Sequence, residues 1–154
     1  MRHRNRVVLT FGTFDVLHVG HLSLLERAST LGRRLVVGVS SDALNIGKKG
    51  RAPVFPQDER LRLVGALRCV DGVFLEESLE DKRAYLLQHR ADLLVMGDDW
   101  VGRFDDLADV CEVQYLPRTP AISTTATIER IRVPRALDLT GTAPAGEAPA
   151  GALL

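Results

Sequence analysis

Cysteine is scarce in this sequence. Its 154 residues include two cysteines, Cys69 and Cys111, and they form neither a metal-binding motif nor a disulfide framework. We interpret both as small buried apolar side chains. Folds that are held together by disulfides or by cysteine-bound zinc are therefore excluded.

An excess of charge of either sign is also absent. Twenty Lys and Arg residues balance twenty Asp and Glu residues, so the formal net charge at pH 7 is zero. Domains that hold nucleic acid through bulk charge are usually basic. We therefore expect no nucleic-acid partner.

Long apolar runs are missing too. No stretch approaches the roughly 20 apolar residues that a membrane-spanning helix needs. Residues 1–6 are basic, but the apolar run after them has only five residues, too few for the core of a signal peptide. We expect a cytoplasmic protein with no membrane partner.

What the sequence does contain is ordinary for a globular domain, with 45% hydrophobic and 26% charged residues. Helical patterns alternate with short apolar runs at residues 7–11, 35–40, 70–75, 91–96 and 110–116. Continuous apolar runs of this kind favour a parallel sheet that is covered on both faces. The alternation predicts a right-handed, doubly wound α/β sheet.

The sequence also predicts three local features between the strands. We expect Gly32 to end a first helix over residues 20–31. The basic segment 47–53, GKKGRAP, is expected to be a flexible loop, either a solvated surface loop or a lid over phosphates. A helix that starts near Pro56 should bury a stripe of Leu61, Leu63, Val64 and Leu67.

Residues 12–21, GTFDVLHVGH, lie where the first strand ends and the first helix begins. Ligands bind at this edge of a parallel sheet, where free N–H groups of the helix attract anions. His18 and His21 are three residues apart, so both imidazoles can donate to a phosphoryl group. From the residues alone, a capping histidine beside a carboxylate-paired one, or a zinc pair, remains open, and Asp15 could hold a metal or an amine.

Two further strings belong to the same edge. Residues 118–125, RTPAISTT, place Ser123 or Thr124 as the N-cap of a helix. Its free N–H groups and Arg118 can hold phosphates, or the segment is a plain capped helix. Residues 95–100, VMGDDW, follow the fourth strand and offer a carboxylate to the amine of a base.

Together these strings resemble a known family. Residues 12–21 are similar to the G-T-F-D-x-L-H-x-G-H signature of the HxGH nucleotidyltransferases, in the cytidylyltransferase branch. Residues 118–125 resemble R-T-x-G-I-S-T-T of that branch, and residues 95–100 resemble the M-G-D-D-W segment of its bacterial glycerol-3-phosphate cytidylyltransferases. The strings occur in the family's order, and the resemblance covers about residues 7–132.

The resemblance implies a Rossmann-like, five-stranded parallel sheet in the order 3-2-1-4-5. It implies a nucleotidyltransferase domain over residues 1–134. The Ala-, Pro- and Gly-rich residues 135–154 have little to bury, and we expect them to be a disordered tail.

The implied reaction transfers CMP from CTP to a phosphorylated alcohol, above all glycerol 3-phosphate, with Mg²⁺ accompanying CTP and a homodimer as the assembly. Phosphoethanolamine, phosphocholine or a phosphonate are alternative acceptors, and ATP is an alternative donor. A nucleotide-binding sensor without turnover is the alternative from another class.

The resemblance also assigns residues. The implied catalytic residues are His18, His21, Lys48 and Arg118, and no side chain is assigned as a metal ligand. The implied acceptor contacts are Lys48, Arg60 and Arg68. The implied nucleotide contacts are Thr13, Phe14, Asp15, Gly20, Asp98, Arg118, Ile122, Ser123 and Thr124.

Some positions depart from the family pattern or stay open. Gly50 stands where the family has the second lysine of a K-x-K pair, and either Lys49 or Arg51 takes its place. Ala121 replaces a glycine. Asp99 rivals Asp98 for the nucleotide.

Overall fold

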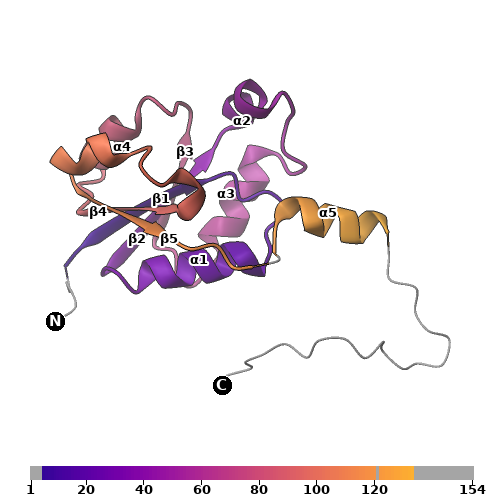
Figure 1. Cartoon of the computed structure of the whole chain (residues 1–154), viewed down its shortest axis with the longest axis horizontal. Coiled ribbons are helices and arrows are strands. Elements are labelled where there is room, and N and C mark those ends of the chain that lie inside the picture. Colours follow the sequence, from indigo (N-terminus) through magenta and orange to yellow (C-terminus); the bar gives the residue numbers. More distant parts are fainter. Residues whose placement is uncertain (1–4, 121, 134–154) are drawn as a thin grey trace, which may run out of the picture.

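The computed structural model describes residues 5–120 and 122–133. Five parallel strands form one sheet in the order β3-β2-β1-β4-β5 (Figure 1). The strands are β1 (Val7–Gly12), β2 (Arg34–Ser40), β3 (Gly72–Glu76), β4 (Leu93–Gly97) and β5 (Glu112–Leu116). The predicted fold class and strand order are confirmed.

Helices connect the strands. They are α1 (Val19–Ser29), α2 (Asp42–Lys49), α3 (Gln57–Gly65), α4 (Lys82–Gln88) and α5 (Thr124–Arg132), with 3₁₀ turns η1 (Asp98–Trp100) and η2 (Asp105–Asp109). The chain turns from β1 toward β2 and β3, then returns to place β4 on the other side of β1. The carboxyl ends of β1 and β4 therefore form the switch point at which such sheets bind ligands.

Both faces of the sheet are buried. Val8 and Val37 face one core with Leu25 of α1 and Val64 of α3. The other core holds alternate strand residues together with side chains of α4 and η2, and it includes the buried Cys111. Neighbouring positions of β1 thus serve opposite cores, which is why its run is continuously apolar.

The end of α1 differs from the prediction. The helix ends at Ser29, and its cap Thr30 has right-handed dihedrals. Gly32 has another function, because a Cβ there would lie 2.6 Å from the Arg6 carbonyl oxygen and from Val8 Cγ2. The glycine permits close packing of the turn against β1 and does not end the helix.

The segment after β2 also differs, because residues 47–49 are helical. The Ser41 hydroxyl caps α2 by accepting from Leu44 N at 3.0 Å, and Gly50 ends the helix at φ 68°. Lys48 and Lys49 are therefore held in the last turn of α2. Only residues 50–56 connect α2 to α3 without regular helix.

The predicted stripe of α3 and the turn after it is confirmed at Val64, which is buried, and at Leu61 and Leu67, which pack against the core, but it fails at Leu63. Leu63 is 41% exposed, whereas Arg60 is fully buried together with Val64. None of the helices in the described ranges is long and apolar enough to cross a membrane. The predicted tail, residues 135–154, lies outside the described residues.

Candidate active site

The two histidines cap α1 at the carboxyl end of β1. Gly20 N donates to His18 Nδ1 at 3.1 Å, and His18 N donates to His21 Nδ1 at 3.4 Å. This reciprocal arrangement is a capping box in which imidazoles replace the usual hydroxyl and carboxylate. The rings stack at a centroid distance of 3.8 Å.

The hydrogen bonds fix which nitrogen carries the proton. Because each Nδ1 accepts, the proton of the neutral ring lies on Nε2. Burial lowers the pKa of His21 to about 4, the His18 ring adds to this, and Asp15 opposes it. Burial also lowers the pKa of His18. Near neutral pH both rings therefore present an uncharged Nε2–H donor.

Two residues of the motif have left-handed backbone. Phe14 has φ 52° and Val16 has φ 48°, a conformation uncommon for bulky side chains. The Phe14 ring is buried and lies edge-on to His21 at 5.4 Å. Its side chain therefore supports the imidazole of His21.

Asp15 is used within the protein. Its carboxylate accepts from Val54 N at 2.8 Å and from Phe55 N at 3.0 Å. It therefore anchors the segment that follows α2. These bonds take the place of the metal or amine that the sequence left open.

The start of α5 meets this motif. The Ser123 hydroxyl caps the helix by accepting from Ala126 N at 3.1 Å. Thr124 Oγ1 donates to the Asp15 carbonyl oxygen at 3.1 Å and lies 3.4 Å from His18 Nε2. A Cβ on Gly20 would lie 3.0 Å from Ile122 Cγ2, so the glycine allows this close approach.

A cavity of about 330 Å³ opens between α2, residues 51–54 and α5. Its wall carries three cationic side chains, Lys49, Arg51 and Arg132, and one glutamate, Glu129. The remaining polar wall is formed by Thr13, Asp15, Asn45, Thr124 and Thr125. Cations and hydroxyls in this arrangement suit an anionic ligand such as a phosphate.

The last turn of α2 separates its two lysines. Lys49 shares a helix face with Asn45 and lies on the cavity wall. Arg51 lies on the same wall, so both candidates for the position of the family's second lysine face the cavity. Lys48 is not on this wall. Burial lowers its pKa, and the Glu76 carboxylate opposes that shift.

Two of the motif strings are joined by an ion pair. Arg118 Nη2 donates to Asp99 Oδ2 at 2.6 Å, and both side chains are exposed. Asp98 makes no ion pair within the part of the chain that the structure describes. Neither Arg118 nor Asp98 is on the cavity wall.

The structure does not bring Arg60 or Arg68 to the cavity. Arg60 is fully buried, and its guanidinium is occupied by protein oxygens. Arg68 is exposed in the segment that enters β3, where Asp71 N donates to the Leu35 carbonyl. That segment lies at the amino ends of the strands, on the opposite edge of the sheet. These positions therefore disagree with the expectation that Arg60 and Arg68 contact the acceptor directly.

Several wall residues were not singled out from the sequence, namely Asn45, Glu129 and Arg132. Their signal is helical spacing. Asn45 lies four residues before Lys49, and Thr125, Glu129 and Arg132 recur along α5 at intervals of four and three residues. With Ser41 and Ser123 placed as caps, this spacing indicates the cavity-facing sides.

Comparison with known proteins gives consistent matches. The family model described as Cytidylyltransferase-like matches residues 9–130. The glycerol-3-phosphate cytidylyltransferase of Bacillus subtilis (strain 168) is 48% identical over 124 residues, which is 80% of this chain and 95% of that protein. The enzyme of the same description from Staphylococcus aureus is 42% identical over 118 residues, 77% of this chain and 89% of that protein.

A solved structure has the same architecture. It is the lipopolysaccharide core biosynthesis protein from Thermoplasma volcanium GSS1, with a TM-score of 0.64 and 26% sequence identity. The match covers 74% of this chain and 96% of that chain.

Proposed function

The chain belongs to the cytidylyltransferase-like family, and we propose on that basis that it transfers CMP from CTP to glycerol 3-phosphate. The products are CDP-glycerol and pyrophosphate. The observation that carries the proposal is the meeting of His18 with Thr124 beside a cavity ringed by cations. The relatives of 42–48% identity favour this acceptor over phosphoethanolamine or phosphocholine.

The reaction is an in-line displacement at phosphorus. A phosphate oxygen of glycerol 3-phosphate forms a new bond to the α-phosphorus of CTP. The bond from that phosphorus to the β-phosphate oxygen breaks, and pyrophosphate leaves with the electron pair. The attacking oxygen is already ionised, so the protein need supply no base. Its task is to bring two anions together and to stabilise the transition state.

His18 and His21 supply the donors for this task. Their Nε2–H groups donate to oxygens on the α- and β-phosphates as charge builds there. Neutral donors fixed by Nδ1 bonds need no reorientation when the charge develops. Thr13, Gly20 and the backbone of Phe14 and Asp15 form the adjoining turn of the nucleotide site.

The cations hold the phosphates. Lys49 and Arg51 from the α2 end, with Arg132 from α5, face the cavity in which phosphate groups are received. Lys48 keeps the role in transfer that its match to the family lysine implies. Ser123 and Thr124 offer the N-terminus of α5 to the leaving pyrophosphate.

Three further contacts rest on resemblance. Arg118 binds phosphate after exchanging its partner Asp99 for the ligand, and Asp98 accepts from the base or ribose. Ile122 packs against the nucleotide. We also propose, on the same basis, that the protein works in the cytoplasm as a homodimer.

Mg²⁺ fits this site as a companion of the triphosphate. The described residues gather no group of three or more His, Cys, Asp or Glu side chains that could hold a metal. Mg²⁺ keeps waters and takes few protein ligands when it arrives on phosphates. Glu129 on the cavity wall is the carboxylate that would complete its shell, since Asp15 binds backbone N–H groups. Its charge, when bound, neutralises part of the triphosphate.

Pyrophosphate release tests the proposal. CTP and ATP are each crossed with glycerol 3-phosphate, phosphoethanolamine and phosphocholine in the presence of Mg²⁺. We expect a signal with CTP and glycerol 3-phosphate that is lost in H18A. Turnover of CTP with another acceptor would replace the substrate and keep the reaction. CTP binding without release in any mixture would indicate a sensor.

A further inference from the structure

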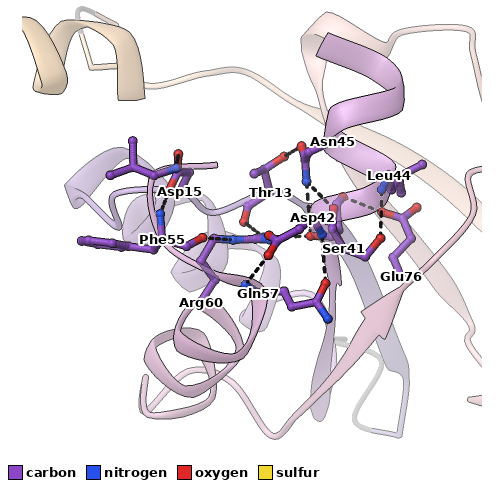
Figure 2. Close-up of polar contacts among 12 residues, drawn as sticks. Thr13, Asp15, Ser41, Asp42, Leu44, Asn45, Phe55, Gln57, Arg60 and Glu76 are labelled. Carbon is purple, nitrogen blue, oxygen red and sulfur yellow. Dashed lines mark hydrogen bonds and ion pairs between the residues drawn. The ribbon is translucent and has the colours of Figure 1, made fainter. Parts of the chain in front are cut away.

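The buried Arg60 lies at the centre of a network of polar contacts (Figure 2). Its Nε donates to the Phe55 carbonyl at 2.9 Å, and its Nη2 donates to Asp42 Oδ1 at 2.6 Å. Its Nη1 donates to the carbonyls of Thr13 at 2.7 Å and Ser40 at 2.8 Å. One side chain from α3 thus ties together the ends of β1 and β2, the start of α2 and the segment after α2.

A second set of bonds fixes α2 to the same frame. Asp42 N donates to Gln57 Oε1 at 2.9 Å, and Gln57 N donates to Asp42 Oδ2 at 3.2 Å. The reciprocal pair joins the first turn of α2 to the first turn of α3. At the other side, Thr13 Oγ1 donates to Asn45 Oδ1 at 2.7 Å. The helix that carries Lys49 is therefore held at its start and at its middle.

Phe55 is held from both sides of its backbone. Its N–H donates to Asp15 Oδ1 at 3.0 Å, while its carbonyl accepts from Arg60. Val54 N, the preceding donor, binds Asp15 Oδ2. Because Arg51 is only four residues before Phe55, these anchors limit where its side chain can lie on the cavity wall.

The energetics favour a guanidinium at this place. A buried cation is strongly unfavourable unless it is paired and its donors are satisfied. Arg60 is 0% exposed and meets three carbonyls and one carboxylate. The planar fork reaches partners in several directions at once, which the single ammonium of a lysine cannot do. Its geometry is thus matched to holding separate segments in register.

We propose that Arg60 is a positioning residue of the nucleotide site, acting through the Phe55 and Thr13 carbonyls. It holds residues 49–55 and the turn after β1 against the cavity, so that Lys49 and Arg51 meet the phosphates. This inference rests on the proposed function and deepens it. It assigns Arg60 to the protein frame and not to the acceptor.

The test compares R60K with R62K. Arg62 is exposed on the same helix, so R62K is the matched control. In R60K we expect the KM for CTP to rise roughly tenfold, since charged hydrogen bonds to phosphate are weakened, while kcat changes less than threefold. Trypsin should also cut faster after Lys49 and Arg51, and CTP should slow that cutting in the wild type. R62K should match the wild type in both readouts.

The local cleavage separates positioning from general stability. Unchanged KM and unchanged cleavage in R60K would overturn the proposal. Loss of kcat at constant KM, with cleavage spread over the whole chain, would overturn it as well.

D15N provides a second route should R60K fail to fold. An amide keeps one acceptor where the carboxylate uses two oxygens, so the same cuts after Lys49 and Arg51 should accelerate. A cleavage pattern like that of the wild type in D15N would count against the proposal. The cleavage readout does not need turnover. A wild-type protein that releases no pyrophosphate would therefore contradict the proposed function, and the cleavage pattern would still test the role of Arg60.

Discussion

At the scale of single residues, the histidine pair offers hydrogen-bond donors and not positive charge. Each Nδ1 is taken by a backbone N–H, and burial lowers both pKa values. The sequence placed the histidines side by side at a helix start. It left their protonation open, because that depends on which backbone donors reach the rings and on how deeply they are buried.

His18 caps α1 through Nδ1 and offers a donor through Nε2, and replacement by asparagine separates these two functions. In H18N the amide oxygen can still cap α1, since asparagine is a favoured N-cap, but the Nε2–H donor is lost. We expect thermal stability to be retained and kcat to fall about 10²- to 10³-fold. H18A should lose a similar factor in kcat and also about 1 kcal/mol of stability. Comparable activity in H18N and wild type would show that Nε2 takes no part in transfer.

The lowered pKa of His21 predicts acid sensitivity. Between its folded pKa of about 4 and the ordinary value of 6.5, the unfolded chain binds more protons than the folded chain. The contribution of neutral His21 to stability is therefore full above pH 6.5 and is lost as pH falls toward 4. H21Q can keep the capping bond without titrating, so its melting temperature should fall less over this window. Thermal unfolding at pH 7, 5.5 and 4.5 provides the comparison, and parallel curves would contradict the assignment.

At the scale of elements, α2 and the segment after it determine which cations face the cavity. A flexible loop would let either lysine reach the phosphates. The Ser41 cap and the left-handed Gly50 instead turn residues 42–49 into a helix, which gives Lys48 and Lys49 different faces. This result was accessible from the sequence in part, since both capping signals are visible there. The glycine at position 47 made the helical pattern hard to recognise.

We expect the cavity cations to act mainly in binding. K49Q and R51Q should each raise the KM for CTP by about tenfold with smaller changes in kcat, because each removes a charged contact to phosphate. K48Q should instead lower kcat. Steady-state kinetics of pyrophosphate release test this division, with R62Q on the exposed face of α3 as the control. An unaltered KM in both K49Q and R51Q would place the phosphates elsewhere.

Arg60 illustrates what a local sequence pattern cannot predict. In a helical stripe the buried positions are expected to be apolar, so the pattern predicts Leu63 to be buried and gives no reason to bury Arg60. The structure exposes Leu63 and buries Arg60, because Arg60 reaches four oxygens from other segments. Such partners lie far away along the chain, and no local pattern identifies them. Asp15 was likewise recognised as polar and near the site, but its partners Val54 and Phe55 could not be foreseen.

At the scale of the whole molecule, the strand order could be predicted because apolar runs and connections strongly restrict α/β topologies. The same topology brings the turns after β1 and β4 and the start of α5 to one edge. What could not be predicted is the shape of the cavity. It depends on how α5 lies beside residues 51–54, and that placement is decided by single contacts such as Thr124 with Asp15.

The described residues contain every group assigned to the site. A chain ending at Val133 keeps all five strands, both histidines and Arg132 on the cavity wall. We therefore propose that residues 134–154 are dispensable for transfer. The shortened protein should keep its melting temperature within about 2 °C, because a stability change well below 1 kcal/mol gives no larger shift, and its kcat/KM should stay within about twofold. A large loss of activity with normal folding would give the tail a part in the reaction.

The contact between His18 and Thr124 joins positions that are 106 residues apart. A ribosome delivers His18 long before Thr124, so the two sides of this contact cannot meet until α5 has been made. A partly synthesised chain therefore displays the histidine motif but lacks the helix start that completes the site. The proposed transfer of CMP therefore requires a chain that has been synthesised at least through α5.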